Sequence, residues 1–241
     1  MERLDKVISN YTEYSRSDVK KLLRDKCVTV NGTIVRDYDY KVDKEKDEIL
    51  VNGEKLNIID NIYIALNKPE GYISATEDRE SLTVLDLIEE NVIRSKIFPV
   101  GRLDKDTTGL IILTSDGVFS HDIVSPKKHV DKVYDATIDK PVTDEMIKGF
   151  EEGVVLRKDG CMVKEEKCMP AKLEIIENNV GRVTLREGKY HQVKRMFEAF
   201  GAKVVKLNRI QIGNYKLPKD LKLGEYRFLN EDDLLKIKGE K

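Results

Sequence analysis

Beyond residue 60, short runs of β-branched and aliphatic residues recur without the regular alternation of strands and helices that builds a parallel α/β sheet. Runs with the composition of strands occur at 62–66, 109–114, 132–138, 171–177, 182–187 and 203–213. Helical patterns lie between them at 81–91, 143–153 and 190–201. We therefore expect an α+β domain over residues 60–241, built on a mixed, largely antiparallel sheet.

Several of these helices carry recognisable ends. Ser81 or Thr83 is placed to cap the first, and Thr143 and Gly153 bracket the second. In the third, apolar residues at helical spacing precede Gly201, where a left-handed residue commonly ends a helix.

Residues 1–59 show a different and self-contained pattern. Apolar residues at helical spacing predict two short helices, and Ser15 with Asp18 has the spacing of a capping box for the second. Asn31-Gly32 and Asn52-Gly53 each separate two strand-like runs, as in tight hairpin turns. We expect a small α/β module of two helices and a small antiparallel sheet.

Basic residues form a stripe on the second of these helices. Arg16, Lys20 and Arg24 recur every fourth residue, and Arg3 and Lys6 lie on the preceding segment. A stripe of this kind suits the phosphates of a nucleic acid. A solvated helix face has the same pattern, so the stripe alone leaves both interpretations open.

The overall charge does not itself indicate a nucleic-acid-binding protein. The formal net charge is −1 and the isoelectric point is about 6.4. Charge is segregated, however, because Lys and Arg outnumber acids from Gly188 to Arg227, whereas acids predominate from Asp43 to Asp60. A basic face on a nearly neutral protein is therefore possible, as is scattered surface charge.

Compartment and redox state are constrained by simple features. No apolar run approaches the ~18 residues of a membrane span, and the charged first residues do not resemble a signal peptide. We expect a cytoplasmic protein without membrane contact. Cys27, Cys161 and Cys168 are few and widely spaced, which predicts reduced thiols and neither disulfides nor a zinc site.

The most unusual segment is 101–117, where a charged loop runs directly into an apolar strand. Such a loop can present a catalytic group rigidly. If the loop is extended, Arg102 and Asp104 point to the same side, and a cation there would keep the aspartate charged for nucleophilic or general-base chemistry. A lone loop aspartate is more commonly part of a turn or a helix cap.

The same loop opens like a calcium-binding EF-hand loop, with Asp104, Asp106 and Thr108-Gly109 at suitable spacing. The twelfth position is Ser115, where a bidentate glutamate is required, and a strand-like run replaces the exit helix. We therefore reject calcium binding, and we expect no metal site.

A second unusual segment is 187–197, which begins a helix with several polar side chains. His191, Gln192, Lys194 and Arg195 crowd its first turn, where the helix terminus and two cations attract anions. His191 is a candidate general acid or base, although satisfying the helix end is the more common role. Lys194 can alternatively pair with Glu198 one turn on.

Together these segments resemble a known family. The string GRLDKDTTGLIILTSDG at 101–117 is similar to the catalytic motif of the pseudouridine synthases. Three further segments resemble other motifs of that family: Lys68-Pro69-x-Gly71, Lys132-Val133-Tyr134 and the tail at 221–229. The segment GKYHQVKRMF is similar to the late motif of the bacterial branch that modifies 16S ribosomal RNA, and residues 1–58 resemble the S4 RNA-binding domain.

The resemblance implies roles for individual residues. Asp104 is the catalytic aspartate of an enzyme that breaks the glycosidic bond of a uridine, turns the base and rejoins it through C5. It also implies that Tyr134 stacks on the base, Arg102 lies near the flipped nucleotide and Lys194 pairs with Asp104. The candidate RNA-binding residues are Arg3, Lys6, Arg16, Lys20, Arg24, Lys68, His191, Gln192 and Arg195.

The same resemblance predicts the partners. The target is uridine 516 of 16S ribosomal RNA, met as free RNA or in an assembling small-subunit particle. We expect no cofactor, because the isomerisation has no redox step and the sequence has no nucleotide-binding glycine motif. We expect a monomer. Whether the aspartate attacks the uracil ring or the ribose, or assists a glycal route, is left open.

Three other functions fit parts of the sequence. A non-catalytic S4-type assembly factor would need RNA binding but not Arg102, Asp104 and Tyr134 together. An S4-bearing methyltransferase would need a glycine-rich cofactor loop after a strand, which the sequence lacks. A phosphoryl-transfer enzyme using the Asp104 loop would need a phosphate cradle.

Overall fold

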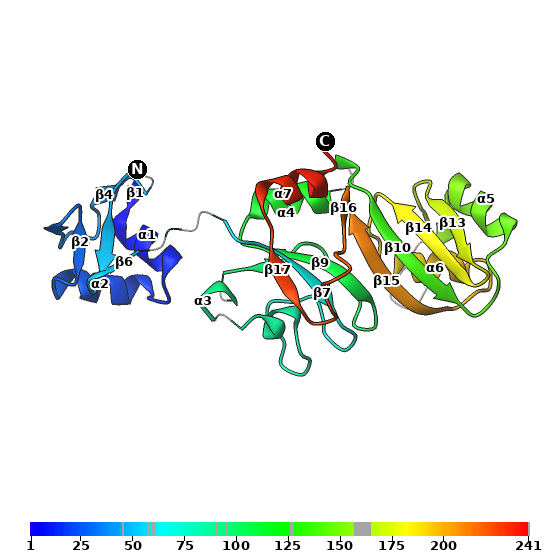
Figure 1. The fold of residues 1–241 in the computed structure, drawn as a ribbon, viewed down its shortest axis with the longest axis horizontal. Coiled ribbons are helices and arrows are strands. Elements are labelled where there is room, and N and C mark those ends of the chain that lie inside the picture. The colour runs from blue at the N-terminus through cyan, green and yellow to red at the C-terminus, as the bar shows by residue number, and fades with distance from the viewer. Residues whose placement is uncertain are drawn as a thin grey trace. The chain divides into compact units, whose positions relative to one another are not determined.

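The computed structural model describes residues 1–44, 46–56, 58, 61–89, 91–94, 96–125, 128–156 and 165–240. The chain divides into two compact units, Met1–Asn61 and Ile62–Lys241 (Figure 1). Three residues that bear on the predictions from sequence lie outside the described residues: Asp60, Cys161 and Glu90, the last within the predicted helix at 81–91.

The first unit contains the two helices and the small sheet that its sequence predicts. The helices are α1 (Leu4–Tyr11) and α2 (Arg16–Arg24). The antiparallel sheet has the order β3 (Thr33–Ile34), β2 (Val28–Val30), β5 (Ile49–Val51) and β6 (Glu54–Lys55). A separate pair consists of β1 (Glu2–Arg3) and β4 (Lys41–Val42).

Local sequence signals account for the boundaries of this unit. The backbone N–H of Ser15 donates to Asp18 at 2.9 Å and the Ser15 hydroxyl accepts from the Asp18 N–H at 3.3 Å, which confirms the capping box. Asn31-Gly32 and Asn52-Gly53 have positive φ at all four residues, as the mirror-image hairpin turns require. The apolar faces of both helices pack against the sheet in one core, which includes Leu4, Ile8, Val19, Leu23, Val28 and Ile49.

The second unit is built on a nine-stranded sheet. Its main order is β13 (Lys172–Glu177), β14 (Val180–Leu185), β10 (Lys132–Ile138), β15 (Val204–Ile212), β9 (Thr108–Thr114), β7 (Tyr63–Lys68) and β17 (Tyr226–Phe228). The short strands β8 (Phe98–Pro99) and β16 (Tyr215–Lys216) pair with β9 and β15. A separate pair is formed by β11 (Val155–Leu156) and β12 (Glu166–Lys167).

Strand direction gives the sheet its mixed character. All neighbouring strands pair antiparallel except β9 and β15, which are parallel. The α+β class with a mixed, largely antiparallel sheet is therefore confirmed.

Helices cover both faces of this sheet. On one face, α4 (Gly117–Val124) and α7 (Glu231–Lys238) pack over β7 and β9 (Figure 1). The other core contains apolar residues of α5 (Asp144–Glu152) and α6 (Gln192–Glu198). Because Leu110 and Ile112 join one core while Ile111 and Leu113 join the other, β9 is buried on both faces and reads as a continuous apolar run.

The predicted helix at 81–91 is wrong. The segment instead forms a 3₁₀ turn, η1 (Val84–Leu87), and a separate short helix, α3 (Asn91–Arg94). Thr83 occupies the N-cap position of this turn, and Asp86 accepts from its backbone N–H at 2.8 Å and its hydroxyl at 3.0 Å. Ile88 then adopts an extended conformation and is buried, so core packing overrides the helical periodicity.

Gly109 allows the close approach of β9 and β15. Its φ is +101°, and a Cβ there would lie 2.3 Å from the Arg209 carbonyl oxygen and 2.3 Å from Asn208 Oδ1. Any side chain at this position would therefore push apart the parallel strand pair. Gly117, at the first position of α4, has open space around its Cβ position.

We predict that Gly109→Ala lowers the free energy of unfolding by about 2–4 kcal/mol, because it combines a left-handed backbone with a clash against backbone atoms. Gly117→Ala is the control and should be neutral or stabilising by up to about 1 kcal/mol. Urea unfolding followed by circular dichroism measures both. Equal stability of the two variants would contradict the close approach.

Candidate active site

Lys68 anchors the loop between β8 and β9 through hydrogen bonds. This side chain is fully buried, and its Nζ donates to the carbonyl oxygens of Pro69 at 3.1 Å, Lys105 at 3.3 Å and Thr107 at 2.7 Å. Burial lowers the pKa of Lys68 to about 8, although Asp106 and Asp104 act in the opposite direction. The ammonium therefore fixes both ends of the turn that follows Asp104.

A second tether lies at the start of the loop. The Ser74 hydroxyl donates to the Leu103 carbonyl and accepts from the Leu103 N–H, both at 2.9 Å. The Thr107 N–H donates to the Asp104 carbonyl at 3.1 Å and closes a turn. Asp104 is thus held between two anchored residues, as a rigid catalytic group requires.

Lys194, on α6, provides the cation next to Asp104. Its Nζ lies 3.0 Å from Asp104 Oδ2 and 2.6 Å from Asp106 Oδ1. Burial acts to lower the pKa of Lys194, but the two carboxylates together outweigh it and raise the pKa above the ordinary lysine value. The alternative pair with Glu198 is not the arrangement found.

His191 approaches the same carboxylate from the residue before α6. Its Nε2 lies 3.5 Å from Asp104 Oδ1, and its ring stacks on Tyr190 with centroids 3.8 Å apart. The backbone of His191 is left-handed, with φ of 46°, as it enters the helix. The helix start predicted from the sequence is therefore present and directed at Asp104.

The expectation that Arg102 is the cation beside Asp104 is wrong. Arg102 is exposed, and none of the ion pairs found among the described residues joins it to Asp104. The expectation assumed an extended loop. The loop instead turns at Asp104, and the Asp104 carboxylate pairs with Lys194 and His191. Arg102 still lines the same cavity as Asp104.

Tyr134 reaches this cavity from the centre of the sheet. It lies on β10 opposite Arg209 of β15, and Arg209 in turn is the register partner of Gly109 on β9. Tyr134 and Arg209 are both buried, with 9% and 3% of their surface exposed. The sheet order β10, β15, β9 therefore brings Tyr134 to the loop that carries Asp104.

The cavity has a volume of about 1190 Å³ and lies within the second unit. Asp104, Tyr134 and His191 all line it, together with the basic residues Arg102, Lys105, Lys132, Lys189 and Arg209. Among the described residues that line it, Asp104 is the only acidic one. The cavity is therefore a basic hollow with a single carboxylate, suited to an anionic ligand.

Three of the predicted RNA-binding residues are buried, and their contacts with RNA stay a prediction. Lys68, Gln192 and Arg195 are 0%, 5% and 6% exposed. Gln192 donates to Glu187 at 2.6 Å and accepts from the Lys189 N–H at 2.9 Å, and Arg195 donates to the Tyr190 carbonyl at 3.3 Å. These bonds hold the segments around the cavity, and Gln192 also lines it.

The basic stripe of the first unit is exposed as predicted. Arg16, Lys20 and Arg24 all face solvent on α2, and Lys20 Nζ lies 4.6 Å from the centre of the Tyr38 ring. Two other candidates are engaged within the unit. Arg3 pairs with the buried Asp5 at 2.8 Å and with Asp39 at 2.9 Å, and Lys6 pairs with Glu2 at 2.8 Å.

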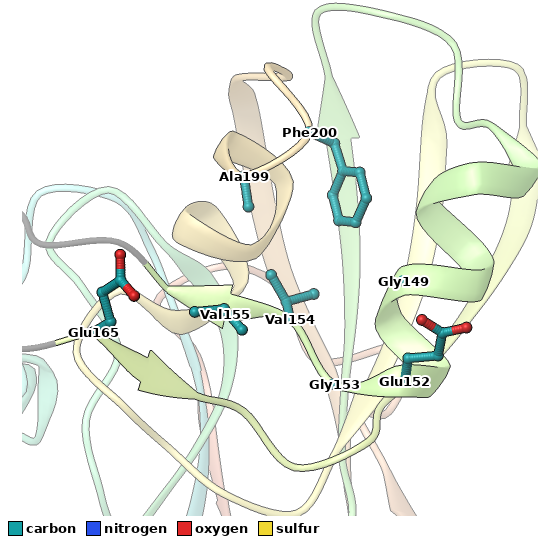
Figure 2. Close-up of a pocket in the computed structure, with 8 residues that line it drawn as sticks. All are labelled: Gly149, Glu152, Gly153, Val154, Val155, Glu165, Ala199 and Phe200. Carbon is teal, nitrogen blue, oxygen red and sulfur yellow. The ribbon is translucent and has the colours of Figure 1, made fainter.

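A smaller hollow of about 310 Å³ lies elsewhere in the second unit. Figure 2 shows Glu152 and Glu165 on opposite sides of Val154 and Val155, with Phe200 above. It contains none of the predicted site residues. The larger cavity is therefore the candidate active site.

Metal and membrane contacts find no support in the residues that the structure describes. Within these ranges, no group of three or more His, Cys, Asp or Glu side chains is arranged to hold a metal ion. Of the helices they form, none is long and apolar enough to cross a membrane.

Comparison with known proteins identifies the family of the chain. Residues 62–199 match the family model for RNA pseudouridylate synthase, and residues 2–49 match the S4 domain. The chain therefore belongs to the RNA pseudouridylate synthase family. It is an enzyme, an RNA pseudouridine synthase, and the predictions of the activity and of the leading S4 domain are confirmed.

Individual relatives cover nearly the whole chain. An RNA pseudouridine synthase of Bacillus subtilis (strain 168), YtzG, described as uncharacterized, is 41% identical over 96% of both chains. Ribosomal small subunit pseudouridine synthase A of Escherichia coli (strain K12) is 41% identical over 98% of this chain and 99% of its own. A crystal structure of a pseudouridylate synthase is 39% identical over 98% of this chain and all of its own, with a TM-score of 0.68.

Sequence reasoning overlooked Arg209 and did not assign a role to Lys132. The signal for Arg209 was available, because Leu207 and Arg209 alternate on the buried side of β15. A charge at an inward-facing strand position needs a partner or a function. Lys132 is also nearly buried, and its Nζ donates to the Val130 carbonyl at 3.2 Å.

We predict an unusual pH dependence of stability from Lys132. Burial, assisted by the charge of Arg209, lowers its pKa from 10.5 to about 8. Between these values the unfolded chain binds the additional proton, so the contribution of Lys132 to stability rises with pH. Relative to Lys132→Met, the wild type should gain about 1–2 kcal/mol in free energy of unfolding between about pH 7.5 and 9.5.

Urea unfolding of the wild type and variant at the two pH values measures this gain. Lys148→Met, at an exposed position of α5, is the control and should leave the pH dependence unchanged. A constant difference between the wild type and Lys132→Met would show that Lys132 is not desolvated.

Proposed function

We propose that this enzyme isomerises one uridine of 16S ribosomal RNA to pseudouridine, with Asp104 as the catalytic carboxylate and uridine 516 as the target. The choice of RNA is supported by the relatives named ribosomal small subunit pseudouridine synthase A and by the late motif at 188–197. The observation that carries the catalytic assignment is the position of Asp104, the single carboxylate among the described residues that line a basic cavity.

Tyr134, Asp104 and Lys194 each have a part in this reaction. A uridine stacked in RNA is unreachable, so it is flipped into the cavity at a cost of a few kcal/mol. Stacking on the ring of Tyr134 returns about 1–3 kcal/mol. Asp104 then meets either the uracil ring or the ribose, and Lys194 at 3.0 Å fixes its position and supplies the counter-charge.

Basic residues around the opening complete the proposed substrate site. Arg102 and Lys105 are exposed and line the cavity next to Asp104, where the phosphates flanking a flipped nucleotide would lie. His191 stands between Asp104 and the stacked ring of Tyr190. We assign phosphate contacts to Arg102 and a positioning role to His191.

The S4 domain adds affinity rather than chemistry. Arg16, Lys20 and Arg24 present three exposed charges on one helix face. Each phosphate neutralised by such a face releases counterions, so the binding is sensitive to salt. We propose that this face binds the ribosomal RNA around the target, as free RNA or in a small-subunit particle.

We predict that Asp104→Asn folds and binds RNA but loses pseudouridine formation by at least about 10³-fold, because an amide is neither a nucleophile nor a base. Asp106→Asn is the matched control. This variant removes the other carboxylate that pairs with Lys194. The Asp106 side chain is exposed and does not line the cavity, so most activity should remain.

The measurement is a map of pseudouridine in 16S ribosomal RNA from a strain lacking the gene, rescued with each version. Full modification by Asp104→Asn would refute the catalytic assignment. Pseudouridine missing from another RNA in the deletion strain, with 16S RNA unchanged, would refute the proposed target.

We predict that the pair Arg16→Glu and Lys20→Glu weakens RNA binding about 10- to 100-fold and reduces the slope of affinity against salt by about two charges. Lys46→Glu with Lys55→Glu changes the net charge equally, but at lysines already paired with Asp43 and Glu48. That control should bind more nearly as the wild type does. Titration of fluorescent RNA at several salt concentrations measures both, and an unchanged slope in the first pair would remove the stripe from the interface.

A further inference from the structure

Arg209 occupies the centre of the candidate active site. It lies on β15, the strand between β10 and β9, and is paired in register with Tyr134 on one side and Gly109 on the other. Only 3% of its surface is exposed, and it lines the large cavity. A residue of this charge is rarely buried so completely without a partner that neutralises it.

The guanidinium group of Arg209 is only partly satisfied. Its Nε donates to the Leu110 carbonyl at 2.7 Å, and its Nη1 donates to the Tyr134 hydroxyl at 3.4 Å. Its Nη2 is buried and has no hydrogen-bond partner among the described residues. A buried donor without a partner is costly, and native structures usually explain one by a ligand or a bound water.

The charge of Arg209 lies near an aromatic ring, with its guanidinium carbon 5.9 Å from the centre of the Tyr134 ring. None of the ion pairs found among the described residues involves Arg209, and Asp104 is paired instead with Lys194 and His191. The charge of Arg209 helps to lower the pKa of Lys132, which lines the same cavity. The hydroxyl of Thr107 is a second buried polar atom without a partner, on another lining residue.

We propose that Nη2 of Arg209 donates a hydrogen bond to a carbonyl oxygen of the flipped uracil and stabilises the negative charge that gathers there during the reaction. This inference rests on the proposed site, with the uridine beside Asp104. Arg209 is then a catalytic residue, because it contacts the reacting base.

Depth in the cavity favours the base over the phosphates. A flipped nucleotide inserts its base, while its phosphates remain on the backbone outside. The exposed Arg102 and Lys105 are accessible to phosphates, whereas Arg209 is buried beside Tyr134, the proposed stacking ring. Uracil offers two carbonyl oxygens as acceptors, and Arg209 offers a donor that is always charged.

The electron count of the reaction places charge on those oxygens by either route. If the bond between C1′ and N1 breaks first, its electron pair stays on the base and delocalises onto O2 and O4. If Asp104 adds to C6, the displaced pair moves to the oxygen on C4. In both cases the C1′–N1 bond breaks, C1′ bonds to C5, C5 loses its proton and N1 gains one. In the addition route, elimination of the Asp104 carboxylate from C6 then restores the C5–C6 double bond and frees the enzyme. A preorganised cation at the oxygen lowers the barrier in either case.

The geometry of the base rotation makes one donor sufficient. Turning uracil by half a turn about the axis through N3 and C6 exchanges N1 with C5, and it also exchanges O2 with O4. A fixed donor that holds one carbonyl before the rotation therefore meets the other carbonyl after it. Arg209 is held from two sides, by Leu110 and Tyr134, as a fixed donor requires.

The first test compares Arg209→Met and Arg209→Lys in single-turnover reactions on a 16S RNA substrate that the wild type modifies. Arg209→Met should lower the rate about 10²- to 10³-fold with unchanged RNA affinity. Arg209→Lys keeps the charge but has no fork with which to bind Leu110 and the base together, so an intermediate loss is expected. A wild-type rate in folded Arg209→Met would overturn the inference.

The second test distinguishes contact with the base from a purely structural role. RNA with 2-thiouridine or 4-thiouridine at the target replaces one carbonyl oxygen by sulfur, a weaker acceptor. The wild type should be slowed by at least one of them, and Arg209→Met should be slowed much less by that same RNA. Equal sensitivity of the wild type and Arg209→Met would overturn the inference.

Two controls keep this outcome interpretable. Thermal unfolding shows whether Arg209→Met is folded. If it is not folded, Arg209→Lys is tested with the thio-substituted RNAs instead. Wild-type sensitivity of Arg209→Lys to these RNAs would then count against the contact. Asp104→Asn is assayed in parallel. If that variant is active, the proposed site is wrong; if it is inactive while Arg209→Met is fully active, only the role of Arg209 is wrong.

Discussion

The buried ammonium of Lys68 is the interaction on which the rest of the site depends. A fully desolvated charge is unfavourable, as the lowered pKa of Lys68 shows, and it is tolerated here because three backbone carbonyls accept from it. Two of those carbonyls belong to the turn that follows Asp104. These hydrogen bonds hold the loop in one conformation, and they thereby fix the position of Asp104 relative to Lys194.

The central strands bring the other half of the site to this loop. Because β9 and β15 run parallel and Gly109 removes the side chain between them, Arg209 lies directly beside the end of the Asp104 loop. Because β15 pairs antiparallel with β10, Tyr134 lies beside Arg209. Residues 104, 134 and 209 are distant in sequence, yet two strand registers are enough to bring them to one cavity, and a slip in either register would separate them.

Local signals in the sequence predicted local structure well, and tertiary burial less well. The capping box at Ser15, both Asn-Gly turns and the strands around Ile111 and Tyr134 need only their neighbours, and they are found as expected. Helices α4 and α7 were not anticipated, although Asp116 and Asn230 cap them. Lys68, Gln192 and Arg195 were predicted as RNA ligands because their charge or polarity is visible in sequence, whereas their burial depends on how the folded chain packs around them.

The distribution of charge explains how a nearly neutral chain can act on RNA. The acidic side chains of the candidate site are largely neutralised, because Asp104 and Asp106 share Lys194. Among the described residues that line the cavity, Lys189 pairs with Glu166 and Glu187. The other lining cations, Arg102, Lys105, Lys132 and Arg209, have no acidic partner in the ion pairs found among the described residues. The cavity therefore carries a local positive potential that the net charge of −1 does not reveal. Such a cavity attracts the phosphates of RNA at its opening. Deeper inside, it stabilises the uracil when negative charge develops on it. The same electrostatics therefore serve binding at the opening and chemistry inside the cavity.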